Sequence, residues 1–346
     1  MGSKLRIGMV GAGGIVLHRH LPALLRMEEV EIVAVSNASY ESSRRFCQEH
    51  LPRATPMKNW ADLVALPDLD VVWIGTPPYM HAPVTISALE AGRHVFCQAR
   101  MAMNLEEAEE MLEASRKNPE LVTALCPPPQ GLKGDHLVRE LLGEQEIGTP
   151  IGFHLRSLAP TFLNPDAPLH WRQRVEISGL NVLALGIYVE VLQRWLGPIR
   201  AISAQGTTLH RIRGGEEVRI PDRVDLLVEF VNGVSGSMEL SGITAGQPVN
   251  DLRIDGSQAS FHYNFSNDEI TINRSGEDPQ AVGIPAAEER HWTVERDFID
   301  AILYPQQPRP RPSFEDGVAY MRVVQAVADS IAEERRIELQ PEKVAS

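Results

Sequence analysis

A glycine-rich segment near the start of the chain has the spacing of a phosphate-binding turn. Gly11, Gly13 and Gly14 directly follow the apolar run 5–10 and precede an amphipathic stretch, 15–27. Gly11 allows a tight turn, and Gly13 lets the backbone approach a diphosphate at the positive end of the following helix. Because this turn opens the first strand–helix unit of an alternating chain, it predicts a dinucleotide-binding site.

Two residues depart from the usual dinucleotide fingerprint. Val16 stands where a third glycine or alanine is usual, and Asn37 stands where an acid normally binds the ribose hydroxyls, about 20 residues on. Asparagine can still bind a hydroxyl, but it does not repel a 2′-phosphate. Two serines and two arginines are nearby, namely Ser36, Ser39, Arg44 and Arg45. These residues favour NADP over NAD; the alternative is that Asn37 merely closes a turn and NAD is bound.

The first 126 residues alternate between short apolar strands and helices, which predicts an α/β Rossmann domain with a parallel sheet covered on both faces. The expected strands are 5–10, 31–36, 70–75, 94–97 and 121–126, and the expected helices are 15–27, 40–50, 80–91 and one that Asn104 caps. Three prolines at 127–129 break this pattern and place a domain boundary there.

Residues 127–346 are expected to form an α+β domain for substrate binding and oligomerisation, with a largely antiparallel, open-faced sheet. The expected elements are a helix at 180–196, strands at 200–208, 225–231, 234–241, 252–255, 259–263 and 269–273, and helices at 292–304 and 315–334. The two C-terminal helices are candidates for packing back on the first domain. A second copy of the chain is the simplest cover for the open sheet face, which predicts a homodimer or homotetramer.

Composition excludes several classes of partner. Lys and Arg number 33 against 46 Asp and Glu, a net charge of −13, which argues against binding to nucleic acid or to anionic membranes. The start of the chain lacks a signal-peptide pattern, and no apolar run is long enough to span a membrane. Three widely spaced cysteines and scattered histidines predict neither disulfides nor a metal site. We therefore expect a cytoplasmic protein with a small-molecule substrate or ligand.

Jointly, several segments resemble the Gfo/Idh/MocA family, named for glucose-fructose oxidoreductase, inositol dehydrogenase and a rhizopine-catabolism protein. The matching segments are the glycine turn, 70–78 with His81, 88–96, 171–172, 178–179, 185–187 and 297–302. The resemblance implies hydride transfer between NAD(P) and a sugar, a polyol or a related hydroxyl compound. The cofactor-binding positions predicted from the turn and the resemblance are Gly11, Gly13, Gly14, Ile15, Asn37, Thr76, Pro77, Pro78, His81, Gln98, Trp171 and Arg172.

The family's usual catalytic residues are replaced in this chain. Under the resemblance, Gln98-Ala99-Arg100 corresponds to the family's Glu-Lys-Pro, so Ala99 stands at the lysine position. The later aspartate and histidine positions are Ala184 and Tyr188. A positioned base contributes about 10²–10⁴-fold to proton removal, and alanine can neither accept a proton nor hold a charge. The resemblance therefore implies a non-standard catalytic site.

Three residues are candidates for the missing catalytic groups. Tyr188 could relay a proton if a cation lowered its pKa, Arg100 is a candidate for that cation, and Gln98 could orient a substrate hydroxyl. In the plainer alternative, Tyr188 is a packed helix residue with a satisfied hydroxyl and Arg100 is an ordinary surface charge. Two functions stay open: an atypical NAD(P)-dependent oxidoreductase, and a catalytically silent NAD(P)-binding regulator, sensor or partner subunit. A lyase or hydrolase that uses NAD transiently would also need a base and has the least support.

Overall fold

The structure, a computed structural model, describes residues 4–127, 132–143 and 145–339, and its chain divides into two units. The first unit contains Met1–Pro127 and Thr293–Ala319, and the second contains Pro128–Trp292 and Tyr320–Ser346. The sequence analysis divided the chain between 126 and 127 and named the two C-terminal helices as candidates for packing back on the first domain. In the structure, the stretch 293–319 belongs to the first unit, and the chain from 320 onward belongs to the second.

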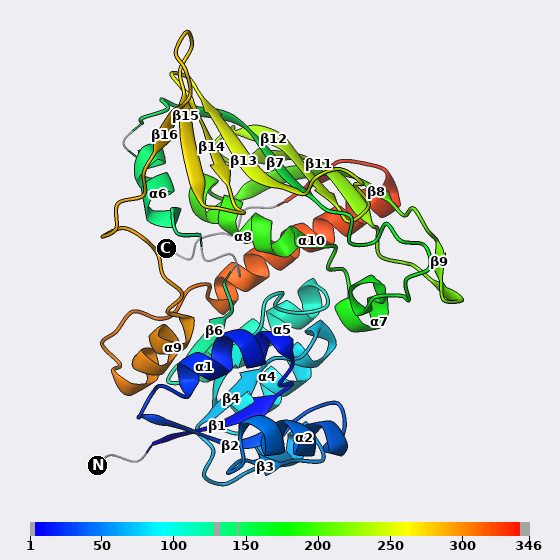
Figure 1. Cartoon of the computed structure of the whole chain (residues 1–346), viewed down its shortest axis with the longest axis vertical. Coiled ribbons are helices and arrows are strands. Elements are labelled where there is room, and N and C mark those ends of the chain that lie inside the picture. Colours follow the sequence, from blue (N-terminus) through cyan, green and yellow to red (C-terminus); the bar gives the residue numbers. More distant parts are fainter. Residues whose placement is uncertain (1–3, 128–131, 144, 340–346) are drawn as a thin grey trace. The chain divides into compact units, whose positions relative to one another are not determined.

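A six-stranded parallel sheet forms the centre of the first unit, as the alternating sequence predicted (Figure 1). The strand order is β3-β2-β1-β4-β5-β6, so the order reverses between β1 and β4. The strands are β1 (Leu5–Val10), β2 (Val30–Ser36), β3 (Thr55–Pro56), β4 (Val71–Ile74), β5 (His94–Cys97) and β6 (Thr123–Leu125). In sheets of this kind, ligands bind outside the carboxyl ends of the strands at that reversal.

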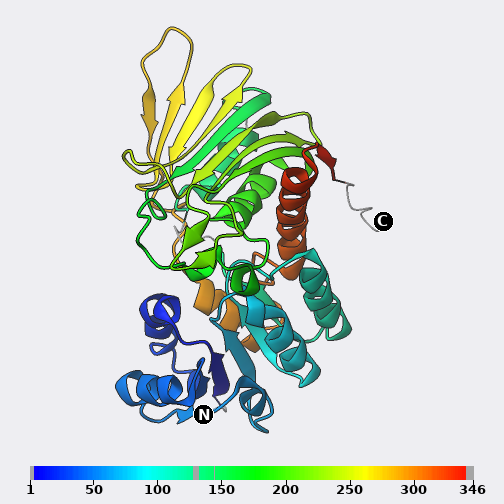
Figure 2. The same cartoon turned by 90° about the vertical axis from the view of Figure 1, so that its right-hand side faces the viewer.

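Helices lie on both sides of this sheet (Figure 2). They are η1 (Val16–His20), α1 (Leu21–Leu24), α2 (Tyr40–His50), α3 (Trp60–Val64), η2 (Pro78–Met80), α4 (His81–Glu90), α5 (Leu105–Lys117), α9 (Val294–Leu303) and the start of α10 (Phe314–Glu333). The prediction of a single helix over 15–27 is wrong, because the structure has η1 followed by α1 in this stretch. Its first part is a π-helical turn in which Leu21 N donates to Val16 O. Pro22 has no N–H to donate to the preceding turn, which accounts for the local widening.

A nine-stranded, mostly antiparallel sheet dominates the second unit, as predicted, with the order β16-β15-β14-β13-β7-β12-β11-β8-β17. Among the strands that the structure describes in this sheet, only β7 and β12 pair in parallel. Its strands are β7 (Pro150–Leu158), β8 (Ile199–Thr207), β11 (Arg223–Phe230), β12 (Ser235–Ser241), β13 (Val249–Gly256), β14 (Ser260–Asn264), β15 (Glu269–Asn273), β16 (Gln280–Val282) and β17 (Ile337–Glu338). β7 was not predicted from the sequence, although this strand joins the two halves of the sheet.

The remaining elements of the second unit are short except for two helices. They are α6 (Asp135–Gly143), η3 (Trp171–Gln173), α7 (Val175–Ser178), α8 (Leu185–Leu196), the small pair β9 (Ile212–Arg213) and β10 (Glu216–Glu217), and the end of α10. The helix expected at 180–196 begins five residues late. Leu183 has a φ of 46°, a left-handed conformation that a continuous right-handed helix excludes. The turn at Asn232 and Gly233 joins β11 to β12 as predicted, with Gly233 at a φ of 89°.

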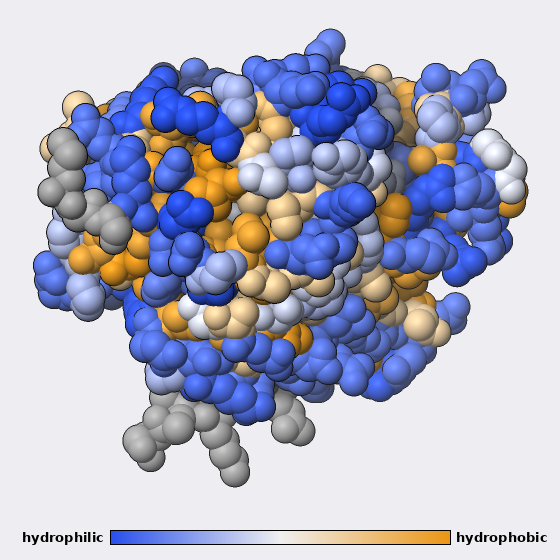
Figure 3. Space-filling model, turned by 90° about the horizontal axis from the view of Figure 1, so that it is seen from below, coloured by the Kyte–Doolittle hydropathy of each residue, from blue (hydrophilic) through white to orange (hydrophobic). Residues whose placement is uncertain are grey.

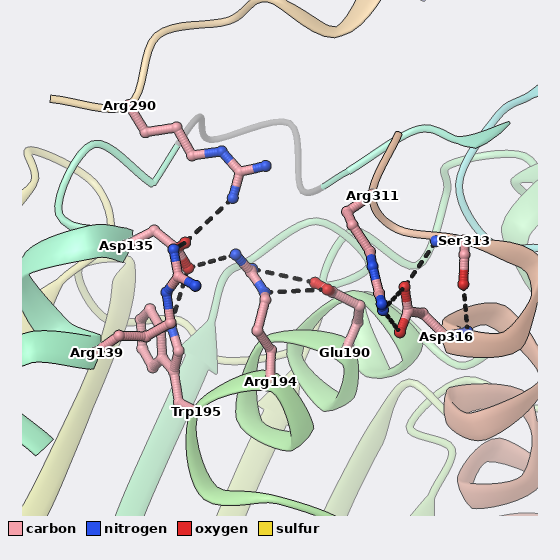
Figure 4. A network of polar contacts seen from close by, with 9 residues as sticks. All are labelled: Asp135, Arg139, Glu190, Arg194, Trp195, Arg290, Arg311, Ser313 and Asp316. Atoms are coloured by element: carbon pink, nitrogen blue, oxygen red, sulfur yellow. Dashed lines mark hydrogen bonds and ion pairs between the residues drawn. The ribbon is translucent and has the colours of Figure 1, made fainter. Parts of the chain in front are cut away.

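A fully buried carboxylate links α6 to α8 (Figure 4). Asp135 Oδ1 accepts from Trp195 Nε1 at 2.9 Å and from Arg194, which also pairs with Glu190 at 3.1 Å. Asp135 Oδ2 accepts from Arg290 Nη1 at 3.1 Å. Because each charge has a partner, we interpret this cluster as an ion-pair network that holds α6 against α8 within the second unit.

Hydrophilic residues border areas where apolar residues reach the surface on the face shown in Figure 3. Within the part of the chain that the structure describes, no helix combines the length and the apolar character that a membrane crossing requires.

Candidate cofactor site and active site

The glycine turn brings the ends of β1 and β4 into close contact. Gly11 has a φ of 84°, and a Cβ built on it would lie 2.5 Å from the side chain of Thr76 and 2.6 Å from its amide nitrogen. A Cβ on Gly75 would lie 2.3 Å from the carbonyl oxygen of Gly11. A Cβ on Gly13 or Gly14 would meet nothing within 4 Å. The turn is therefore tight on the protein side and open on the side where a diphosphate would bind.

A cavity of about 520 Å³ opens beside this turn, which is within the usual range of roughly 300–1,000 Å³ for small-molecule sites. Its lining residues are Val10, Gly11, Ala12, Gly13, Ser36, Asn37, Ala38, Ser42, Lys58, Asn59, Trp60, Gly75, Thr76, Pro77, Tyr79 and Met80. No aspartate or glutamate is among them. The hydroxyl of Thr76 is buried without a hydrogen-bond partner among the described residues. Buried hydroxyls in folded proteins usually have a hydrogen-bond partner, so this one marks the turn as a place where a polar group is missing.

Asn37 both closes the turn and lines the cavity. Its Oδ1 accepts from Ala12 N at 2.7 Å, and its own main-chain N–H donates to Ser43 Oγ at 2.9 Å. The amide oxygen is therefore committed to the glycine turn. The Nδ2 atom is 3.5 Å from Ser42 O, a long contact that leaves this amino group able to donate to a ligand.

The cation in the cavity wall is one that the sequence analysis missed. Arg44 pairs with Glu41 at 2.9 Å on the exposed face of α2, and neither Arg44 nor Arg45 lines the cavity. Lys58 lines it instead. Its signal in the sequence was weak because β3, which positions it, has only two residues.

His81 braces two backbone segments and does not line the cavity. The ring is fully buried, with Nε2 at 2.8 Å from Thr76 O and Nδ1 at 2.9 Å from Arg100 O. Burial lowers the pKa of His81, although carbonyl oxygens at both nitrogens partly oppose this effect. The ring thus lies between main-chain carbonyl oxygens of the segments that follow β4 and β5. Ile15, Gly14 and Pro78 are also outside the cavity lining.

A second buried histidine was missed by the sequence analysis. His20 Nδ1 is 2.5 Å from Glu295 Oε1, and His20 Nε2 is within hydrogen-bond distance of Gln98 Nε2. A carboxylate oxygen can only accept, so it places the ring proton on Nδ1 and leaves Nε2 to accept from the Gln98 amide. Among the described residues, Gln98 Oε1 then has no partner and remains available to a ligand. Trp73 and Phe96 pack beside the imidazole, at centroid distances of 5.1 and 5.3 Å.

Arg100 is not the exposed surface charge that the plainer alternative assumed. Its side chain is buried, with 7% of its surface exposed, just beyond the end of β5. Gln98, at the end of β5, has the same exposed fraction, and its N–H donates to Ile74 O at 3.1 Å. Ala99, between them, contributes no polar side-chain atom to this segment.

Tyr188 lies on α8 in the second unit, and its hydroxyl is already held. It is 2.5 Å from Asn250 Oδ1 and 3.3 Å from Ser157 Oγ. Burial raises the pKa of the Tyr188 phenol, and no cation is among the causes of this shift. Ala184 is the N-cap residue of α8, and its carbonyl oxygen accepts from Tyr188 N at 3.2 Å.

Trp171 and Arg172 form a stacked pair, also in the second unit. The Arg172 guanidinium carbon lies 4.2 Å from the centre of the Trp171 ring. Burial lowers the pKa of Arg172, and no carboxylate pairs with it among the described residues. A half-buried cation on an aromatic face is suited to bind an anionic or strongly polar ligand group.

Family profiles match both units. The oxidoreductase family with an NAD-binding Rossmann fold matches residues 5–125, and the GFO/IDH/MocA C-terminal domain matches residues 136–262. The chain belongs to the GFO/IDH/MocA oxidoreductase family. Its first unit is thus an NAD-binding Rossmann fold, as the glycine turn predicted.

Several curated relatives of this GFO/IDH/MocA protein are sugar-related oxidoreductases by name. Levoglucosan dehydrogenase of Pseudarthrobacter phenanthrenivorans is 25% identical over 97% of this chain and 98% of its own length. A dTDP-3,4-didehydro-2,6-dideoxy-alpha-D-glucose 3-reductase of Streptomyces antibioticus is 31% identical over 61% of this chain and 62% of its own. A 1,5-anhydro-D-fructose reductase of Ensifer adhaerens is 28% identical over 66% of this chain and 67% of its own.

Solved structures share the fold over nearly the whole length. Levoglucosan dehydrogenase in complex with NADH and L-sorbose superposes with a TM-score of 0.84 at 23% identity, covering 98% of this chain and all of that one. An oxidoreductase domain protein from Kribbella flavida superposes with a TM-score of 0.86, also at 23% identity and with the same coverage. At these identities the likeness establishes the fold.

Proposed function

We propose that this GFO/IDH/MocA protein transfers hydride between a nicotinamide cofactor and a hydroxyl or carbonyl group of a sugar, a polyol or a related compound. The family supports the reaction class. The substrate class is supported by the names of the relatives, which act on levoglucosan, a dTDP-linked deoxysugar and anhydrofructose.

One observation carries the cofactor part of the proposal. The turn at Gly11 and Gly13 lies at the reversal of strand order, beside a cavity that Thr76, whose buried hydroxyl has no hydrogen-bond partner among the described residues, also lines. The residues present fit a dinucleotide: small glycines for the diphosphate, Asn37 and Ser36 for the ribose, and Pro77 and Tyr79 as flat walls. We include Trp171 and Arg172 as further cofactor contacts. When bound, the cofactor supplies the hydride acceptor or donor.

The proton that accompanies hydride transfer needs a partner in this chain. The family's lysine and aspartate positions are Ala99 and Ala184, so neither can supply a base. We propose that Tyr188 supplies the proton, because its raised pKa keeps the phenol protonated at neutral pH. A protonated donor suits reduction of a carbonyl group better than oxidation of an alcohol. Gln98 would orient the substrate through its free amide oxygen, and Arg100 would stabilise developing negative charge near the end of β5.

A second candidate function follows from the same replacements. With Ala99 and Ala184 in place of ionisable residues, the protein could bind NAD(P) without turnover and act as a regulator, a sensor or a silent partner subunit. If Ala99→Lys gained turnover, the site would be an oxidoreductase site that lacks only the catalytic lysine.

For the cofactor, we propose a preference for NADP. Support comes from the neutral Asn37 and from the absence of any carboxylate among the residues that line the cavity. An acid at position 37 would repel a 2′-phosphate, whereas an amide does not.

We further propose a homodimer or homotetramer formed through the open face of the nine-stranded sheet. Leu227, near the middle of β11, is 66% exposed on this sheet. An apolar side chain on a broad sheet surface is suited to cover by a second copy. Size-exclusion chromatography with light scattering tests this assembly, and a Leu227→Lys variant should shift it toward the monomer.

The first experiment is a titration of the purified protein with NADH and with NADPH. Five tryptophans are present, and one of them, Trp60, lines the cavity, so energy transfer to a bound nicotinamide reports binding. Saturable binding followed by turnover in a panel of sugars and ketosugars supports the oxidoreductase. Saturable binding without turnover supports the silent binding protein. No binding by folded protein would refute both.

A further inference from the structure

We infer that Lys58 selects the cofactor by pairing its ammonium group with the 2′-phosphate of NADP. The inference deepens the proposed function and rests on it, because it assigns a specificity residue within the same cofactor site.

The position of Lys58 is fixed by the edge of the sheet. β3 pairs in parallel with β2 through Ala34 and Val35, and Met57 N donates to Val35 O at 2.8 Å. The next residue, Lys58, therefore lies beside the carboxyl end of β2, where Ser36 and Asn37 also line the cavity. In Rossmann domains, this end of the second strand is where the adenosine ribose is bound.

The ammonium group of Lys58 is available to a ligand. The side chain is exposed, and it has neither an ion pair nor a hydrogen bond among the described residues. The nearest alternatives in sequence are less suitable, because Arg44 pairs with Glu41 and lies outside the cavity lining. Of the cavity-lining residues, Lys58 alone carries a charge, and that charge is positive.

Asn37 and Lys58 act together in this assignment. The oxygen of Asn37 is committed to Ala12 N, so it does not present a free acceptor to a ribose 2′-hydroxyl. Its Nδ2 group and the Lys58 ammonium are both donors. Two donors and no acid at this point match a phosphate better than a hydroxyl that itself needs an acceptor.

The test compares adenine nucleotides that differ only in the 2′-phosphate. The probes are 2′,5′-ADP and 5′-AMP, which bind without the nicotinamide end, together with NADPH and NADH. Wild type should bind 2′,5′-ADP and NADPH more tightly than 5′-AMP and NADH. Lys58→Gln should weaken 2′,5′-ADP and NADPH by about tenfold or more, the usual effect of losing one charge-assisted hydrogen bond, and should leave 5′-AMP and NADH unchanged.

Lys117→Gln is the matched control. Lys117 is an exposed lysine of the same unit on α5, paired with Glu113 at 3.5 Å, and it does not line the cavity. The same loss of charge there should alter neither affinity. Salt gives a second measurement: the advantage of 2′,5′-ADP over 5′-AMP should shrink as salt rises in wild type. Lys58→Gln should show a smaller advantage that depends less on salt.

Each other outcome overturns the inference in a distinguishable way. If Lys58→Gln weakened the binding of all four nucleotides equally, Lys58 would contact the 5′-phosphate that they share or would attract nucleotides through its charge in general. Unchanged binding would show that Lys58 makes no contact. A wild-type preference for NADH would refute selection by Lys58 but leave the proposed function standing, whereas failure of folded wild type to bind any nucleotide would refute the proposed function itself.

Discussion

His20 Nδ1 lies 2.5 Å from Glu295 Oε1, although 275 residues separate the two in sequence, and both side chains are almost completely buried. The pair connects η1, which follows the glycine turn, to α9, in the stretch that rejoins the first unit. On its other side, His20 receives the amide of Gln98 at the end of β5. The stretch that contains Glu295 therefore forms part of the Rossmann unit. Through His20, it is connected to Gln98, a residue of the candidate active site.

Removing one member of this pair should lower the stability of the folded protein. Glu295→Ala leaves the buried Nδ1–H of His20 without its acceptor, and we expect a loss of about 1–3 kcal/mol in the free energy of unfolding. Glu295→Gln keeps an acceptor for the Nδ1 proton and should recover part of that loss. Chemical denaturation followed by circular dichroism measures both.

Glu315→Ala is the control for the buried pair. Glu315 is 56% exposed and 3.9 Å from Arg116, so its removal should cost no more than about 1 kcal/mol. If Glu295→Ala and Glu315→Ala lost equal stability, the buried pair would contribute no more than a surface pair.

Gly11→Ala should damage the cofactor site itself. The added Cβ would lie 2.5 Å from the side chain of Thr76, and the residue must also keep a φ of 84°. We expect at least a tenfold loss in affinity for the nicotinamide dinucleotide, because Thr76 and the turn must move apart. Fluorescence titration measures this loss.

Gly92→Ala separates the contact from the backbone strain. Gly92 has a similar φ of 75°, but a Cβ there would meet nothing within 4 Å. It should cost about 1–3 kcal/mol in stability and leave cofactor affinity intact. A comparable affinity loss in both variants would mean that general strain, and not the approach to Thr76, explains the effect.

Asn37→Asp should reverse the cofactor preference. An aspartate can still accept from Ala12 N, so the turn is retained, but the new charge faces the position proposed for the 2′-phosphate. NADPH affinity should fall by about tenfold, whereas NADH affinity should hold or rise as the carboxylate accepts from the ribose hydroxyls. Asn104→Asp provides the control, since Asn104 caps α5 outside the cavity and aspartate caps equally well. A parallel fall in both affinities would argue against a 2′-phosphate at this position.

Much of the first unit could be predicted from the sequence because its signals are local. The glycine turn and the apolar runs of β1, β2, β4 and β5 are each legible within about ten residues. Asn104 also caps α5 as expected, accepting from Glu107 N at 2.9 Å. The side chain of Glu107 accepts a hydrogen bond from Met103 N, one residue before the cap.

The features that the sequence analysis missed depend on contacts distant in the chain. His20 has no local sign of a role, because its partners Glu295 and Gln98 come from α9 and β5. Lys58 was missed because the pairing of a two-residue strand brings it to the cavity. The pKa of Tyr188 could not be predicted either, since it depends on burial and on Asn250, which belongs to a strand 62 residues away.

Tyr188→Phe tests the proposed proton donor. The variant removes the hydroxyl that Asn250 and Ser157 hold, so stability should fall by about 1–3 kcal/mol, and carbonyl reduction should fall by about 10²–10⁴-fold. Tyr304→Phe, at a 46% exposed tyrosine, should change neither quantity.

The pH dependence of carbonyl reduction gives a readout that a packing role would not produce. Because burial raises the pKa of Tyr188, the active, protonated form persists through neutral pH and is lost only as pH rises through that elevated pKa. The rate should therefore stay level from neutral pH into the mildly alkaline range and fall beyond it, after allowance for stability. Stability follows the same sign, since the folded state favours the protonated phenol and loses this advantage at high pH. If Tyr188→Phe lost only stability and kept the wild-type rate and pH profile, Tyr188 would be a packing residue and the proton would have to come from bound water.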